Sequence, residues 1–343
     1  MTAPIDFVYT WVDGELNAAL RDAAVGEVGT GANRFRDNSE LFHSIESVRI
    51  FAPWVRRVFV VAADGQSPEW YDPEQYPNVE VVPHSVVFGE HAGGLPVFNS
   101  HAIEAVLHQI PGLSERFVYF NDDMFLGAPA RPSDFFSEDG TAVVRTSETI
   151  TPKWNTHRKE WRVYRGKVDG LLRELHPGAV CYNTAHQART LLKSVCEASW
   201  QVPSLREHLL AVVRAKFRSK SDIAPIELFA NQMLLTDRAS RVHDKGVVLC
   251  IFDNTVLKPE FWALERLRPA FYCINDDMKN PSQAHLRRLR EQLATGLPHH
   301  GAGQSASAGS HTVATVAHSV AGSLSRLNRL AARLTGGLLH NRL

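Results

Sequence analysis

Short apolar runs that alternate with helical stretches limit the fold of this chain more than any other feature of its sequence. The runs 5–11, 58–62, 79–82 and 117–120 are rich in β-branched and aromatic residues, and most of them stop at turn-forming residues, as buried strands do. Between them, residues 39–51 and 102–110 have the apolar spacing of helices. We therefore expect an α/β fold in which a mostly parallel sheet is flanked by helices.

The second half of the chain has a more helical pattern. Residues 188–233 predict helices that break at Pro203 and at 217–222, whereas residues 140–185 predict irregular structure. Two further apolar runs, 246–252 and 271–274, predict strands, and residues 282–293 predict a charged helix. We interpret residues 1–297 as one domain with a helical insertion at about 150–240.

The C-terminal part changes composition twice. Residues 298–319 are rich in Ala, Gly, Ser and His and predict a flexible linker. Over 320–343 leucines recur at helical spacing with arginines among them and no acid, which predicts a basic amphipathic helix. Such a helix suits an anionic membrane surface, and the alternative is a frayed tail or a helix docked on its own core.

Charge and cysteine content exclude several classes of protein. Lys and Arg number 37, as do Asp and Glu, so no global positive field favours a nucleic-acid partner. The four cysteines are far apart without a CxxC pair, which predicts reduced, mostly buried thiols and neither a zinc site nor a disulfide framework. The sequence shows no signal-peptide pattern and no run of about 20 apolar residues. We expect a cytoplasmic protein, whose tail would place it at the inner face of the membrane if the amphipathic helix binds lipid.

Two copies of an acidic motif follow apolar runs. Asn121-Asp122-Asp123-Met124 follows the run 117–120, and Asn275-Asp276-Asp277-Met278 follows the run 271–274. Adjacent carboxylates repel each other unless a cation neutralises them, and Mg²⁺ or Mn²⁺ bound to a substrate diphosphate does so with oxygen ligands. The alternative is two ordinary turns, which Asn and Asp also favour. The first interpretation predicts that the two motifs converge on one metal–diphosphate site.

Two further segments could contact a nucleotide substrate, the first at its base or ribose and the second at its phosphate. Asp13 lies where ligands bind in such sheets, beyond the carboxyl end of a strand, although an Asp-Gly pair also suits a plain turn. Arg34, Arg36 and Asp37 precede a helix, where phosphate binds readily. Capping of that helix by Asp37 or Asn38 is the alternative, and the two are compatible.

Three other residues are ambiguous from the sequence alone. Arg218, in the FRSKSD segment, could hold phosphate oxygens or be an ordinary exposed arginine. His186 could serve as a general base, and otherwise it is one of 16 scattered histidines. Glu104 has the position of a surface helix residue.

The stretches that carry these residues resemble a known family. Residues 5–14, 34–70, 95–127, 217–223 and 271–280 are similar to the four conserved regions of the Stealth family, the bacterial capsular polysaccharide phosphotransferases. That family is in turn similar to the catalytic core of the animal N-acetylglucosamine-1-phosphotransferase. The resemblance covers roughly residues 5–290 and is weak across 140–185.

The resemblance implies a reaction, a fold and a set of site residues. A UDP-sugar would donate sugar-1-phosphate, such as N-acetylhexosamine-1-phosphate, to a hydroxyl of a glycan or glycolipid acceptor, with Mg²⁺ or Mn²⁺ assisting and UMP leaving. The sheet would bind the nucleotide sugar. The family's essential acid falls on Glu104, its metal-binding acids on Asp122 and Asp123, and its arginine on Arg218. Its fourth region falls on Asn275 and Asp276. The family often carries His-x-x-His, where this chain has Asn183 and His186.

The roles that follow are expectations. Asp122, Asp123 and Asn275 are predicted to hold the metal, and Arg218 to stabilise oxygens of the transferred phosphate. Glu104 or His186 would accept the proton of the acceptor, and the ordinary pKa of histidine favours His186. Two alternatives stay open: a metal-dependent glycosyltransferase that releases UDP, and a non-catalytic, membrane-associated partner in polysaccharide assembly.

Overall fold

The largest sheet of the protein contains the strands that the apolar runs predict. The computed structural model describes residues 3–14 and 36–300 of the chain. In these residues the largest sheet has five strands in the order β3-β2-β1-β4-β8. Its strands are β1 (Ile5–Thr10), β2 (Val58–Ala62), β3 (Val79–Pro83), β4 (Arg116–Asn121) and β8 (Arg189–Leu192). The first four are parallel and β8 runs antiparallel to β4, so the expected mostly parallel α/β sheet is confirmed.

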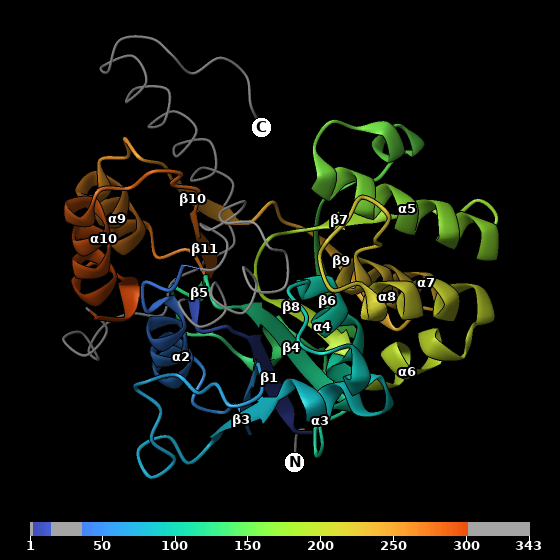
Figure 1. The fold of residues 1–343 in the computed structure, drawn as a ribbon, viewed down its shortest axis with the longest axis horizontal. Helices are drawn as coiled ribbons and strands as arrows, with labels where there is room; N and C mark the ends of the chain where they lie inside the picture. Colours follow the sequence, from blue (N-terminus) through green and yellow to red (C-terminus); the bar gives the residue numbers. More distant parts are fainter. Residues whose placement is uncertain (1–2, 15–35, 301–343) are drawn as a thin grey trace.

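Aromatic side chains fill both faces of this sheet, because alternate residues of a strand point to opposite sides. On one face Tyr9 stacks on Phe120 at a ring distance of 5.0 Å and its hydroxyl hydrogen-bonds Ser44 of helix α2 (Glu40–Phe51). On the other face the hydroxyl of Tyr119 reaches Glu104 of helix α4 (Ser100–Val106). The two predicted helices therefore cover opposite faces of the sheet (Figure 1).

Two small sheets complete the described strands. One has the order β10-β11-β5 and the other the order β7-β6-β9. Their strands are β5 (Met124–Leu126), β6 (Ala142–Thr149), β7 (Tyr182–Thr184), β9 (Ala239–His243), β10 (Val247–Ile251) and β11 (Phe271–Asp276). The first of these sheets packs with α9 (Leu257–Leu267) and α10 (Gln283–Thr295) around a separate apolar cluster that includes Tyr272 and Phe261.

Most of the remaining helices lie at the other end of the molecule from α9 and α10 (Figure 1). They are α5 (Glu160–Leu175), α6 (Lys193–Gln201), α7 (Pro203–Arg214) and α8 (Pro225–Leu235). The short helix α3 (His84–Phe88) follows β3 directly. Of the helices described, none is both long and apolar enough to cross a membrane.

Two secondary-structure predictions are wrong in this region. The segment 189–192 is strand β8 and not the start of a helix, because its residues pair with β4 from Arg189 to Leu192. The segment 140–185 is not irregular, since it contains β6, α5 and β7. Pairing between distant segments decides these elements, and local spacing does not show it.

All four cysteines are free thiols, and three of them are buried, as expected. The predicted linker at 301–319 and the predicted tail helix at 320–343 lie outside the described residues.

Candidate active site at the carboxyl edge of the sheet

The two acidic motifs lie on neighbouring strands. Strand β4 ends at Asn121, and the chain turns through Asp122 and Asp123 into β5. Strand β5 pairs antiparallel with β11, with Met124 opposite Cys273. The backbone N–H of Ile274 donates to the carbonyl oxygen of Asp123 at 2.9 Å, which extends the pairing into both motifs. The two motifs therefore lie side by side. A turn is present at Asp122 and Asp123 of the first motif, whereas Asn275 and Asp276 of the second belong to strand β11. That the motifs share one metal–diphosphate site remains a prediction.

Asp122 and Asp123 form an electrostatically strained pair. Burial and the carboxylates of Asp123 and Glu40 raise the pKa of Asp122 well above its ordinary value. Burial raises the pKa of Asp123 to about 6, and a hydrogen bond from Cys273 together with the charge of Arg189 limits that rise. The thiol of Cys273 donates to Asp123 Oδ2 at 3.2 Å. Like charges held this close are stable only when a proton or a cation neutralises them.

Several buried oxygens at this edge lack a hydrogen-bond partner among the described residues. They are Oδ1 of Asp123, Oδ1 of Asn121 and Oδ1 of Asn38. Buried acceptors nearly always receive a hydrogen bond, so a group of unsatisfied oxygens at one edge of the sheet needs an explanation. A divalent cation with oxygen ligands fits this chemistry, because carboxylate and amide oxygens are the groups that Mg²⁺ and Mn²⁺ prefer.

Asp123 also lies near two softer ligands. The ligand atoms of Asp123, His186 and Cys273 are all within 4.8 Å of one another. Burial raises the pKa of the Cys273 thiol well above its ordinary value, and Asp123 raises it further. This thiol therefore remains protonated and hydrogen-bonded to Asp123, and a site built on the oxygen ligands suits the acids better.

The second motif is arranged differently from the first. Asp276 forms an ion pair with Arg36, and its Oδ2 also accepts from Nδ2 of Asn38 at 3.3 Å. Asn275 lies opposite Cys250 of β10, on the same face of β11 as Cys273. The ion pair ties the segment before α2 to β11. The predicted metal role of Asn275 and the predicted substrate role of Asp276 remain predictions.

The start of α2 adds acids to the same region. Asp37 Oδ1 accepts the backbone N–H of Ser39 at 2.7 Å, and its Oδ2 accepts from Nε1 of Trp11 at 3.0 Å. Glu40 is buried, and Asn38 donates to it from its backbone and from Nδ2, at 2.6 and 2.8 Å. Burial raises the pKa of Glu40 to about 7. The N-cap position of α2 is Ser39, which makes no side-chain capping bond, so the predicted capping of this helix by Asp37 or Asn38 is wrong. Asp37 adds negative charge to the site, and this charge contributes to the raised pKa of Asp122.

Glu104 is buried and is not the surface helix residue that its position suggested. Its Oε1 accepts from the hydroxyl of Ser100 at 3.3 Å and from the hydroxyl of Tyr119 at 3.4 Å. Tyr119 in turn hydrogen-bonds Thr10 at 3.1 Å, and Arg218 donates to Ser100. A continuous polar chain therefore runs from the end of β1 to the loop that holds Arg218.

Two arginines bring positive charge next to the acids. Arg189, at the start of β8, donates to Nδ1 of His186 at 3.1 Å, and its Nε is buried without a partner among the described residues. Arg165 donates to Glu227 at 3.3 Å. Burial and the charges of Arg189 and Arg165 lower the pKa of His186 to about 3. This histidine is neutral at neutral pH, and its Nδ1 lone pair is engaged.

For two of the predicted substrate contacts, the structure gives little information about their role. Asp13 is half-buried beyond β1, and its backbone N–H donates to the side chain of Gln66 at 3.0 Å. Arg34 lies outside the described residues. Their substrate roles stay predictions.

Sequence reasoning missed several polar groups of the site. Arg189 lies in a segment whose sequence predicts a helix, Arg165 in one that predicts irregular structure, and Tyr119 in an apolar strand. Asn38 and Glu40 were treated only as parts of a helix start. A lone arginine at the head of the apolar run 189–192 is the one signal that could have indicated Arg189.

The fold and site together define an α/β protein with an acid-rich, arginine-lined centre at the carboxyl edge of its sheet. Residues 34–144 match the Stealth protein conserved region 2 family. A capsular polysaccharide phosphotransferase of Neisseria meningitidis serogroup B is 30% identical over 298 residues, which are 81% of this chain and 78% of that protein. The chain therefore belongs to the Stealth family.

Other relatives are longer than this chain. An exopolysaccharide phosphotransferase of Streptomyces coelicolor is 35% identical over 86% of this chain, which spans only 50% of that protein. Among solved structures, a galactosyltransferase determined in complex with donor and acceptor sugar analogues aligns with a TM-score of 0.44 and 11% identity, over 89% of this chain and 97% of that one. A structural likeness at that level carries no conclusion about function.

Proposed function

We propose that this protein transfers sugar-1-phosphate from a UDP-sugar to a hydroxyl of a glycan acceptor during the synthesis of a capsular or other cell-surface polysaccharide. The observation that carries the proposal is the side-by-side placement of paired acids and unsatisfied arginine. Asp123 lies within reach of the charge of Arg189, whose buried Nε has no partner among the described residues. Relatives named polysaccharide phosphotransferases support the choice of reaction.

Asp122, Asp123 and Asn275 would hold Mg²⁺ or Mn²⁺, and the orphaned oxygens of Asn121 and Asn38 are further candidates. A bound cation would neutralise negative charge on the diphosphate of the sugar donor. Arg189 and Arg218 would bind phosphate oxygens, since the planar guanidinium matches them in pairs. The proposed substrate contacts are Asp13, Arg34, Arg36, Asp37 and Asp276.

The reaction balances without any further reactant. The acceptor oxygen attacks the phosphorus nearest the sugar, a phosphorus–oxygen bond forms, and the bond to the oxygen between the two phosphates breaks. UMP leaves with the electron pair of that bond. The acceptor hydroxyl loses its proton to a side chain, and positioning and charge neutralisation supply most of the rate.

Glu104 or His186 would accept that proton, and the observed arrangement favours Glu104. Arg189 occupies the Nδ1 lone pair of His186, and the low pKa of this ring makes it a weak base. Glu104 is buried and oriented by Ser100 and Tyr119. The preference for His186 that rested on the ordinary pKa of histidine therefore loses its basis.

Replacement of each residue separates the two candidates. Glu104→Gln keeps the size of the side chain and should lower turnover by about 100-fold or more, whereas His186→Gln should lower it less. Melting temperatures of both variants show whether folding is intact. A total loss of turnover in His186→Gln with near-normal turnover in Glu104→Gln would assign the base to His186 instead.

A panel of nucleotide sugars incubated with the protein and Mg²⁺ tests the proposed reaction. Chromatography of the products should show UMP with a UDP-sugar. Release of UDP would identify a conventional glycosyltransferase. A protein that releases no nucleotide from any sugar donor or acceptor tried would favour a non-catalytic partner in polysaccharide assembly.

A further inference from the structure

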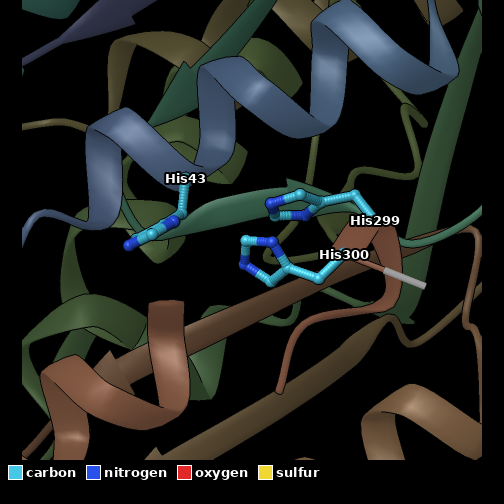
Figure 2. Close-up of side chains that lie close together, drawn as sticks. All are labelled: His43, His299 and His300. Atoms are coloured by element: carbon cyan, nitrogen blue, oxygen red, sulfur yellow. The ribbon is translucent and has the colours of Figure 1, made fainter. Parts of the chain in front are cut away.

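A cluster of three histidines lies between helix α2 and the chain that follows α10. His43 lies in the first turn of α2, and His299 and His300 follow α10 (Figure 2). One nitrogen from each ring lies within 4.8 Å of the others. The ring centroids of His43 and His300 are 5.7 Å apart, and those of His299 and His300 are 4.2 Å apart. None of the three was singled out by the sequence.

Two of these rings are buried without hydrogen-bond partners. His43 is 6% exposed and His299 is 2% exposed. Nδ1 of His43 and both ring nitrogens of His299 have no partner among the described residues. Buried imidazoles are normally satisfied, so these bare nitrogens require an explanation.

The third ring makes the kind of hydrogen bond that metal-binding histidines usually make. Nε2 of His300 lies 3.0 Å from the carbonyl oxygen of Leu293, so this nitrogen carries the proton and donates it. The Nδ1 lone pair of His300 is then free. A histidine that binds a metal usually donates its other N–H to a carbonyl or a carboxylate, which fixes the ring and the tautomer.

The charge state of the cluster also suits a metal. Burial lowers the pKa of His43 to about 4 and that of His299 to about 3, so both are neutral at neutral pH. Metal binding requires unprotonated imidazole. Glu46, one turn further along α2, is the acid whose charge reaches His43. It is already paired with Arg49 at 2.7 Å.

We propose that His43, His299 and His300 bind a single Zn²⁺ ion that fastens the chain after α10 to helix α2. Three imidazole ligands suit a borderline-soft ion such as Zn²⁺ and disfavour Mg²⁺, which prefers oxygen. The site is distinct from the acids at the carboxyl edge of the sheet, of which only Glu40 belongs to α2. Zinc here would hold α2 in place and with it Asn38 and Glu40.

Zinc binding by the whole chain tests the proposal. The protein is stripped with a chelator and titrated with Zn²⁺ in the presence of millimolar Mg²⁺, which competes for oxygen-ligand sites. We expect one tightly bound equivalent, and a rise in melting temperature of about 4 °C or more with zinc in excess. A wild-type protein that binds no Zn²⁺ under these conditions would overturn the proposal.

Single-residue variants test which side chains bind the zinc ion. Zinc binding should be lost in His43→Ala and in His299→Ala, and kept in His243→Ala, where an exposed histidine of β9 is removed. Asp123→Asn should also keep it, which separates this site from the acids. His299 lies in a short 3-10 turn after α10, so its variant answers the question if His43→Ala fails to fold. Full zinc binding by His299→Ala, or loss in Asp123→Asn alone, would contradict the assignment.

The same titration with Co²⁺ gives an independent spectroscopic signature. Cobalt in a nitrogen-ligand site of low coordination number should give visible absorption bands, and His299→Ala should remove them. Bands that persist in His299→Ala and vanish in Asp123→Asn would place the ion at the acids and overturn the proposal.

Discussion

At the residue scale, the carboxylates of the site are held in an arrangement that costs stability. Asp122 and Asp123 follow each other in a turn, and the acids at the start of α2 add their charge. Folded proteins tolerate such repulsion at functional centres, where a substrate or an ion relieves it. Removing one of these charges should therefore affect activity and stability in opposite directions.

We expect Asp123→Asn to lower turnover by about 100-fold or more while the melting temperature stays the same or rises. The substitution removes a ligand charge and also relieves the repulsion with Asp122. Turnover with saturating Mg²⁺ and thermal unfolding measure the two effects. Asp237→Asn is the control, because Asp237 is exposed in a left-handed conformation that Asn also adopts. Unchanged turnover in Asp123→Asn would refute the proposed role.

The raised pKa of Asp123 predicts a pH dependence of stability. Its pKa rises from 3.8 to about 6 on folding, so the folded state is favoured while this carboxyl is protonated. That contribution is present below the unfolded pKa and is lost as the pH rises through the folded one. In chelator, the stability of the wild type relative to Asp123→Asn should fall by on the order of 1–3 kcal/mol between about pH 4 and about pH 7.

Denaturant unfolding of both proteins across this range measures the difference. Mg²⁺ should reduce the loss at neutral pH, because a cation replaces the proton as the neutralising group. A stability difference that stays constant with pH would show that Asp123 is not strained in the folded protein.

Some residues of the site can be identified from the sequence and others cannot, because the two groups are brought to the site in different ways. Asp122, Asp123 and Asp276 follow apolar strands, and local sequence shows this directly. Arg189 and Arg165 reach the site through tertiary packing of a segment whose local pattern is weak. The cluster of His43 with His299 and His300 joins residues that only the folded chain brings together.

At the scale of elements, the pairing of β5 with β11 assembles the site. Both strands are short, and the partners are separated by about 150 residues, as the bond from Cys273 to Asp123 shows. The sequence predicted that the motifs converge, but it did not give the antiparallel register. Register in such a pair is fixed by side-chain packing and by the ends of the ladder.

Gly127, directly after β5, tests the importance of this pairing. Its N–H donates to the carbonyl oxygen of Ala270 at 3.1 Å, and a Cβ atom there would overlap the carbonyl oxygen of Pro269. Gly127→Ala should therefore displace β5 from β11, destabilise the protein by about 2 kcal/mol and lower turnover. The control Gly170→Ala lies in helix α5 with open space around it, and should be neutral or stabilising.

Thermal unfolding and turnover of the two glycine variants give the comparison. Equal stability and activity of Gly127→Ala and Gly170→Ala would mean that the β5–β11 register does not govern the site.

At the scale of the whole molecule, the large sheet with its helices and the smaller sheet with α9 and α10 form two apolar cores. The acids of the site lie where the two cores meet, in the turn between β4 and β5 and at the end of β11. The alternating pattern of the first half predicted the large sheet well, because its strands are buried on both faces and read as apolar runs. The smaller sheet, with strands from both halves of the chain, could not be predicted in the same way.

The basic segment 320–343 lies outside the described residues, and its sequence supports a prediction of its own. We expect the full chain to sediment with liposomes that contain anionic lipid, because its arginines and leucines suit such a surface. A truncated chain without 320–343 should remain in solution, and neutral liposomes serve as the control. Equal binding by the two proteins would rule out this membrane contact.

The fate of the phosphate next to the sugar tests the central claim most directly. A UDP-sugar labelled in that phosphate is incubated with the protein, Mg²⁺ and a glycan acceptor, and the label is followed. We expect the label to enter the glycan as a phosphodiester while unlabelled UMP is released. Label recovered in free UDP, with an unlabelled glycan product, would contradict it.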